Sequence, residues 1–199
     1  MERNGLSPIK LEDAIRDLAD AFKGRKVKFI FVGALAVKAY GHDNRVTYDI
    51  DAEVVMENKE DYNLMEKFIE DYMIRKGIPA HLTDNVSRWG MIDIPSGYRD
   101  RTKLFKKIKD IEFHLLSPVD LVISKLRAFR DKDIEDSKYL VRKFNISIDE
   151  IKKAAEKAIE TSPRSLELGN FKRNLNFFFD ELRLEIENKV QLDEPEIKL

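Results

Sequence analysis

The sequence predicts an α+β protein, because strand patterns are confined to residues 1–116 and only helical patterns follow. In the first part, short β-branched and aromatic runs alternate with helical spacings. In the second part, apolar residues recur every three or four positions behind recognisable helix caps. We therefore expect an α/β core over 1–116 and a helical region over 117–199 that covers the functional site of the core.

The first 55 residues predict the order helix, strand, helix, strand. A helix is expected over 7–23, where Ser-Pro opens an amphipathic pattern. Residues 27–32, VKFIFV, predict a central strand covered on both faces. Gly33 then turns the chain into a short helix over 34–40, and a second strand is expected over 45–55.

The middle of the chain predicts one long helix and three further strands. The helix runs from an Asn58 cap to about Arg75. The run WGMIDI at 89–94 predicts a strand, and residues 103–116 predict a strand pair broken near 109–110.

Helices account for the rest of the chain. Ser117 followed by Pro118 predicts an N-cap with proline in the first turn. Two more helices are expected over 133–144 and 147–161, and the last is expected to start at an Asn170 cap.

The composition excludes several classes of protein. There is no cysteine, which excludes disulfides, a cysteine-ligated zinc and a cysteine nucleophile. The net charge of −1 gives no overall electrostatic footprint for nucleic acid. No apolar run approaches the roughly 20 residues of a membrane span and no signal-peptide pattern is present, so we expect a cytoplasmic protein without a membrane partner. The high Lys and Glu content and the single glutamine favour a thermophilic source.

Asp49 and Asp51 are the first candidates for chemistry. On a strand, residues two apart face the same side, about 6.6 Å apart along the backbone. Ile50 between them faces the core. Two carboxylates held together repel unless a cation lies between them, and oxygen ligands favour Mg²⁺. The alternative is a pair of solvated acids on a half-exposed strand, and we expect Glu53 to be a solvated strand end.

Asp93 is the candidate for a third carboxylate. Within the predicted strand 89–94, Ile92 and Ile94 face one way and Asp93 faces the other. If this strand lies beside the second strand, Asp93 completes a site of the two-metal kind. The histidines have no spacing that suggests a metal site or a triad.

Gly33 and Lys125 are candidates for binding phosphate. A glycine between a strand and a helix lets the backbone approach a phosphate, although an ordinary tight turn has the same pattern. Lys125 lies inside the apolar stripe of its helix, so it either extends to water or reaches an anionic ligand. Asp136 could orient Lys125 or a bound base, Arg45 could meet phosphate or pair with an acid, and Asp133 is expected to be an N-cap.

Together these motifs resemble the DNA polymerase β-like nucleotidyltransferase superfamily, and most closely its prokaryotic abortive-infection-type toxin branch. The first motif of that branch is a glycine pair, a short helix and R-x-(S/T)-x-D-I-D; here Gly33-Ala34 is followed by RVTYDID at 45–51. The second is P-x-D-L-x-x-x-K-L followed by K-D-x-x-D, present here at 118–126 and 132–136. The resemblance covers about residues 27–140.

The resemblance implies a nucleotidyltransferase fold, a small mixed sheet flanked by helices, and Mg²⁺- or Mn²⁺-dependent transfer of a nucleoside monophosphate from an NTP to an acceptor hydroxyl. It implies that the metals are held by Asp49, Asp51 and Asp93, which with Lys125 form the catalytic set. The nucleotide would be bound by Gly33, Ala34, Arg45, Thr47, Lys125 and Asp136. An RNA end (including tRNA), a protein or a small molecule is the implied acceptor, and a cognate antitoxin is an implied partner.

Three alternatives remain open at this stage. A catalytically silent nucleotide-binding or partner-binding domain is supported by Ala34, where the family carries glycine or serine. A structural interaction protein would use the phenylalanines near 171–179 as an interface. The basic cluster could steer RNA or be a solvated hairpin; it consists of Arg99, Arg101, Lys103, Lys106, Lys107 and Lys109.

Overall fold

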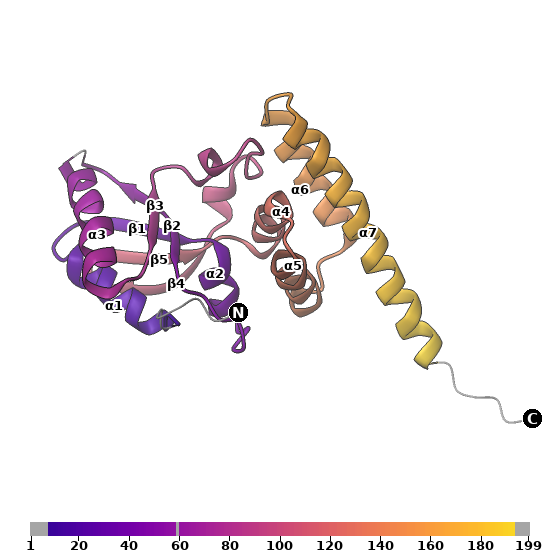
Figure 1. Ribbon diagram of the computed structural model, residues 1–199, viewed down its shortest axis with the longest axis horizontal. Helices are drawn as coiled ribbons and strands as arrows, with labels where there is room; N and C mark the ends of the chain where they lie inside the picture. The colour runs from indigo at the N-terminus through magenta and orange to yellow at the C-terminus, as the bar shows by residue number, and fades with distance from the viewer. Residues whose placement is uncertain (1–7, 59, 194–199) are drawn as a thin grey trace, which may run out of the picture.

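The computed structural model describes residues 8–58 and 60–193, and it confirms the α+β class (Figure 1). The described residues form a five-stranded mixed sheet with the strand order β3-β2-β1-β5-β4. The strands are β1 Val27–Phe31, β2 Ile50–Met56, β3 Ala80–Thr83, β4 Lys103–Ile108 and β5 Ile111–Leu115. The helices are α1 Leu11–Ala21, α2 Gly33–Ala39, α3 Glu60–Lys76, α4 Pro118–Ala128, α5 Asp131–Phe144, α6 Ile148–Thr161 and α7 Leu166–Asp193.

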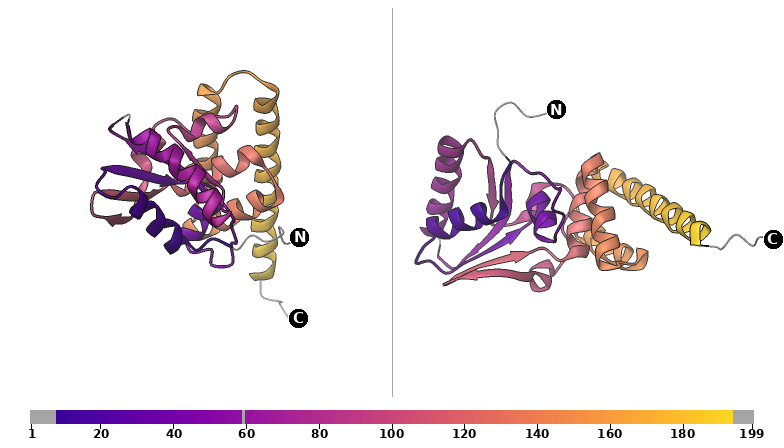
Figure 2. Two further views of the ribbon diagram at one scale, coloured as in Figure 1. Left: turned by 60° about the vertical axis from the view of Figure 1, so that its left-hand side comes forward. Right: turned by 90° about the horizontal axis from the view of Figure 1, so that it is seen from below.

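The sheet is built around β1, as its apolar sequence predicts. β1 pairs antiparallel with β2 and parallel with β5, while β3 extends the sheet in parallel with β2. Phe29 of β1 stacks on Phe113 of β5 and meets Phe22, just past α1, edge to face. Helices α1 and α3 cover this face of the sheet (Figure 2).

The helical region lies beyond the end of the sheet where β1 finishes and β2 begins (Figure 1). Helix α2 contacts both α4 and α5, and α4 contacts α6 and α7. Ser117 caps α4 by accepting a hydrogen bond from the Asp120 backbone N–H, as predicted. No helix in the described ranges combines the length and apolar character needed to cross a bilayer.

The predicted strand over 89–94 is wrong. Residues Val86–Trp89 form a 3₁₀ turn, and an irregular segment follows up to Tyr98. Ile92 and Ile94 are buried as the alternation predicts. However, the backbone N–H groups of Asp93 and Ile94 donate to the hydroxyls of Ser162 and Ser87, so they make no strand ladder.

A strand that was not predicted, β3, occupies the place beside β2. Its four residues follow Pro79 and are too few for a clear alternating pattern. The second predicted strand is correspondingly shorter than expected, because the stretch 45–49 precedes β2 as an irregular segment.

Several predicted helix starts are also corrected. Helix α7 begins at Leu166, where Ser165 Oγ accepts from the Leu168 N–H, so Asn170 lies inside the helix. Helix α5 begins at Asp131, so Asp133 is not its N-cap but lies within the first turn. The predicted start of the first helix at Ser7 lies outside the described residues, and α1 begins at Leu11.

The phenylalanine stripe of α7 belongs to the core. Phe171, Phe178 and Phe179 are all buried. The neighbouring Phe177 is 52% exposed and meets Phe129 edge to face. This removes the main support for a structural interaction protein that uses the stripe as an interface.

The stripe can be tested with two adjacent substitutions. We expect Phe178→Ala to lower the free energy of unfolding by about 3–5 kcal/mol, because it leaves a cavity in the core. Phe177→Ala, on the exposed side of the same helix, should cost about 1 kcal/mol or less. Chemical denaturation of both variants measures the difference, and equal losses would contradict the assignment of Phe178 to the core.

Candidate functional site

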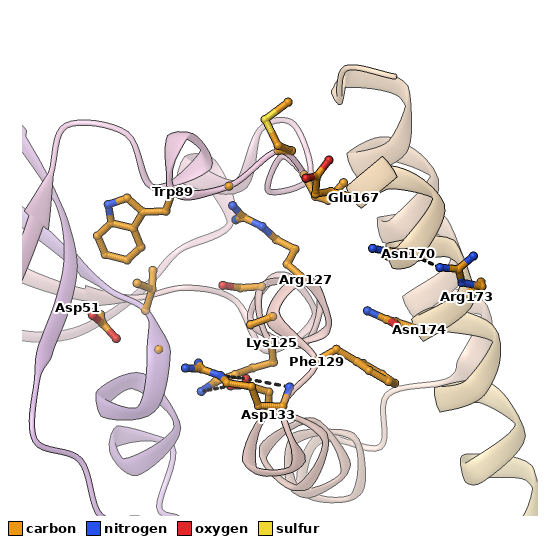
Figure 3. A pocket seen from close by; sticks show the side chains of 18 residues that line it. Asp51, Trp89, Lys125, Arg127, Phe129, Asp133, Glu167, Asn170, Arg173 and Asn174 are labelled. Carbon is orange, nitrogen blue, oxygen red and sulfur yellow. Dashed lines mark hydrogen bonds and ion pairs between the residues drawn. The ribbon is translucent and has the colours of Figure 1, made fainter. Parts of the chain in front are cut away.

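A cleft of about 680 Å³ lies between the sheet and the helical region (Figure 3). Gly33 and Asp51 line it from the core, and the segment 89–92 forms another wall. The helical region contributes Lys125 and its neighbours on α4, the start of α5, and the first turns of α7. Three of the site residues predicted from the sequence, Gly33, Asp51 and Lys125, therefore line one cavity.

Gly33 and Asp51 are in direct contact at one end of this cleft. The Val32 N–H donates to the Asp51 carbonyl at 3.0 Å, which holds the end of β1 beside the start of β2. Gly33 has φ +62°, and a Cβ at this position would lie 2.3 Å from Asp51 Oδ2. Only glycine satisfies both constraints. The predicted glycine turn and the predicted carboxylate thus form one unit.

Asp49, Asp51 and His81 form a cluster that could hold a divalent metal. One ligand atom from each residue lies within 4.8 Å of the others. Asp51 is paired in register with His81 on β3, and His81 Nδ1 lies 2.9 Å from Asp51 Oδ1. Thr47 Oγ1 donates to Asp49 Oδ1 at 2.6 Å and orients that carboxylate.

The donor set fits a divalent cation. Two carboxylates and one imidazole suit Mn²⁺ and related ions, and the carboxylates alone suit Mg²⁺. The hydrogen bond to Asp51 raises the pKa of His81 above its usual value, against the opposing effect of burial. This increase reports the negative charge that the two aspartates concentrate at the site.

His81 was missed from the sequence, and Asp93 lies elsewhere. The histidines were judged by their spacing from one another, whereas His81 acquires its partners across the strand pair β2–β3. Asp93 is not part of the metal-binding group found among the described residues. It lines a separate hollow of about 420 Å³ with Tyr98 and Thr161. The strand argument that brought Asp93 to the aspartate pair fails with the strand itself.

Lys125 lies at the centre of a network of ion pairs whose two carboxylates are buried. Its side chain is 5% exposed, and Nζ lies 2.7 Å from Asp136 and 3.3 Å from Asp133. Asp136 also accepts from Arg45 Nε at 2.8 Å, and Asp133 accepts from Arg130 Nε at 2.7 Å. Asp136 does contact Lys125, as predicted, and Arg45 pairs with an acid.

This network of ion pairs carries more positive than negative charge. Three cationic side chains share two carboxylates, which leaves a formal excess of +1. Burial alone would raise the pKa of Asp133, but the hydrogen bond from Arg130 and the charge of Lys125 lower it below the usual value. Asp133 therefore stays ionised, and the excess positive charge lies where Lys125 and Arg130 line the cleft.

Glu53 is a buried anchor, and its predicted role as a solvated strand end is wrong. Its side chain is fully buried and accepts from the Val86 N–H at 2.8 Å, from Arg99 Nε at 2.6 Å and from the Tyr98 hydroxyl. The segment after β3 folds over this face of the sheet, which a sequence pattern does not reveal. These bonds attach the turn that carries Trp89 to the strand that carries Asp51.

Half of the basic cluster is engaged in ion pairs within the protein. Arg99 pairs with Glu53, Arg101 with Asp120 and Lys107 with Glu112. The charges of these three residues are neutralised within the protein, so half of the cluster is no longer available to steer RNA.

Three comparisons place the chain among known proteins. Residues 9–183 match the family model described as "Nucleotidyltransferase of unknown function (DUF6036)". A similar solved structure is the crystal structure of an antigenic nucleotidyltransferase-like protein from Paracoccidioides brasiliensis, with 16% identity, a TM-score of 0.49, and coverage of 85% of this chain and 95% of that chain. A search of curated protein sequences found no significant match.

Gly33→Ala should disrupt the metal cluster. The new methyl group would collide with Asp51 and displace its carboxylate, so Mn²⁺ binding measured by calorimetry should fall at least about tenfold. Gly24→Ala is the matched control, because Gly24 also has a left-handed φ, +79°, but no atom lies within 4 Å of its Cβ position. Equal Mn²⁺ affinities for the two variants would contradict the contact.

Removing the charge of Lys125 should destabilise the fold. Lys125→Met leaves Asp133 and Asp136 buried with one cation each, and we expect a loss of about 3–5 kcal/mol in the free energy of unfolding. Lys107→Met is the control, because it breaks an exposed pair with Glu112 and should cost about 1 kcal/mol or less. Urea denaturation of both variants distinguishes these outcomes.

Proposed function

The chain belongs to the family of nucleotidyltransferases of unknown function that its sequence matches over residues 9–183, and we propose that it transfers a nucleoside monophosphate from an NTP to an acceptor hydroxyl. The observation that carries the proposal is the contact between the Gly33 turn and Asp51 at the edge of a cleft that Lys125 also lines. A phosphate-binding turn, a metal-binding carboxylate and a cation thereby face one cavity.

Asp49, Asp51 and His81 would hold the divalent metal, either Mg²⁺ or Mn²⁺. Such an ion neutralises phosphate charge and polarises the phosphorus centre that is attacked. In this proposal His81 occupies the third position that Asp93 was expected to fill. Thr47 would keep Asp49 turned towards the ion through the hydrogen bond already described.

Lys125 and Arg130 would bind the triphosphate. Both line the cleft. The network of ion pairs to which they belong has an excess of positive charge that an anionic ligand would neutralise. The backbone N–H groups at the start of α2, including that of Ala34, would contact phosphate oxygens beside Gly33. Asp136 and Arg45 would act through Lys125 by fixing its position.

The transfer step requires no other reactant. The acceptor hydroxyl oxygen forms a bond to the α-phosphorus, the bond from that phosphorus to the bridging oxygen breaks, and pyrophosphate leaves. The hydroxyl proton passes to water. The toxin branch, a tRNA or protein acceptor and a cognate antitoxin remain predictions from the motif resemblance.

A catalytically silent nucleotide-binding domain is the second candidate. It is favoured by the cluster itself, which contains a histidine instead of a third carboxylate among the described residues, and by Ala34 in the turn. Such a protein would bind NTP through the same cleft and transfer nothing.

Label transfer distinguishes the two candidates. The protein is incubated with α-³²P-labelled NTPs, Mg²⁺ or Mn²⁺, and either total RNA or cell lysate. We expect label on an acceptor, and a loss of roughly 100-fold or more in Asp51→Asn, because metal ligation supplies several kcal/mol of transition-state stabilisation.

Asp110→Asn is the control, since Asp110 lies in the exposed turn between β4 and β5. Its activity should equal that of the unmodified protein. NTP binding without label on any acceptor would favour the silent candidate, and absence of NTP binding would overturn both.

A further inference from the structure

Arg127 is a partly buried cation without an acidic partner among the described residues. It lies in the last turn of α4 and lines the cleft. Its Nη2 donates to the Ser87 carbonyl at 3.3 Å, and within the described ranges no carboxylate oxygen approaches it to 4.0 Å. Burial lowers its pKa below the usual value, against the more distant charge of Asp93.

Four other arginines near the site are compensated. Arg45, Arg99, Arg101 and Arg130 each pair with a carboxylate that is itself buried. A guanidinium has five N–H donors, and removing it from water without an anion is costly. Among the described residues that line the cleft, Arg127 and the exposed Arg173 have no carboxylate partner, and Arg173 bonds to the Asn170 amide oxygen. Arg127 is the less exposed of the two, so an anion entering the cleft would supply the partner that it lacks there.

Trp89 lies on the wall of the cleft that the Arg127 side chain reaches from α4. The guanidinium lies close to the segment that carries Trp89, since it donates to the Ser87 carbonyl and a Cβ added at Gly90 would lie 3.1 Å from its Nη2. The indole is 43% exposed and lines the cleft. Among the described residues, no ring or cation is stacked on it.

The position of this pair separates it from the triphosphate residues. Lys125 points to α5, where it meets Asp133 and Asp136, whereas Arg127, two residues later on α4, reaches the opposite wall. Figure 3 shows the indole on the Asp51 side of this wall and Arg127 nearer to α7. A ligand on Trp89 and Arg127 would therefore lie beside a nucleotide bound at Lys125 and Arg130.

We propose that Arg127 and Trp89 form an acceptor subsite that binds a nucleotide unit, with its phosphate on the guanidinium and its base on the indole. A flat aromatic group and an anion are the two features that this pair can recognise together. Asn170 and Asn174 of α7 line the same cleft and offer amide groups to the base or sugar. The inference rests on the proposed function, and it narrows the acceptor to a free nucleotide or the end of a strand.

Binding of the two ligands is measured separately. Affinity for the acceptor is measured by fluorescence anisotropy with a labelled single-stranded 12-mer RNA, and AMP is added as a competitor. Affinity for ATP with Mn²⁺ is measured by calorimetry. We expect Arg127→Met and Trp89→Ala each to weaken RNA or AMP binding about tenfold or more, and to change ATP affinity by less than about threefold.

The controls address folding and local charge. Arg88 is an exposed cation in the turn that carries Trp89, and it pairs with Asp84 at 3.7 Å. Arg88→Met should leave the affinities for RNA and for ATP unchanged. Arg127→Lys keeps the charge but loses the planar fork, so it should bind RNA with intermediate affinity. This variant also tests the proposal if Arg127→Met fails to fold.

The outcomes are distinct. Competition by AMP supports a single nucleotide as acceptor, and binding of RNA alone supports a strand end. An equal loss of ATP affinity would assign Arg127 to the NTP, and unchanged RNA and AMP affinities would make it structural; either result overturns the subsite. If nucleotide binding depends on Arg127 but no label transfer occurs, the subsite stands and the proposed enzymatic function fails.

Discussion

The buried ion pairs around Lys125 are the interaction on which the rest of the structure depends. They join three separate parts of the chain, because Arg45 precedes β2, Lys125 lies on α4 and the two aspartates lie on α5. Each charge is costly to bury alone, and each is acceptable only while the others stay in place. These ion pairs consequently hold the helical region in place beside the Asp49–Asp51 pair. The cleft between the sheet and the helical region therefore depends on both parts of the chain.

A second set of contacts, centred on Glu53, fixes the opposite wall of the cleft. β2 carries Asp51 on the face that Glu53 also occupies, two residues further along. Through Glu53 the same strand holds Val86 and Tyr98, which flank the segment with Trp89. One strand therefore positions the candidate metal site and the segment that brings Trp89 to the proposed acceptor subsite.

Local patterns predicted much of the fold and part of the site. The Gly33 turn, the Asp49–Asp51 pair, the β4–β5 hairpin and the Ser117 cap each depend on residues close in sequence. The predictions that were wrong concern residues whose partners are distant in the sequence. The alternating burial in 89–94 was read correctly, but its backbone is bonded to serine hydroxyls, one of them from α6. His81 and Glu53 likewise acquire their partners only when β3 and the segment after it fold onto β2.

The histidine in the candidate metal cluster would affect the charge balance of the site. A third carboxylate would add a full negative charge beside Asp49 and Asp51, whereas a neutral imidazole adds a ligand without charge. Fewer negative charges weaken electrostatic attraction for Mg²⁺, and a nitrogen ligand shifts the preference towards Mn²⁺ and related ions. The excess positive charge near Lys125 and the uncompensated Arg127 then act in the same direction. Both reduce the negative potential of the cleft and would favour the entry of an anionic ligand.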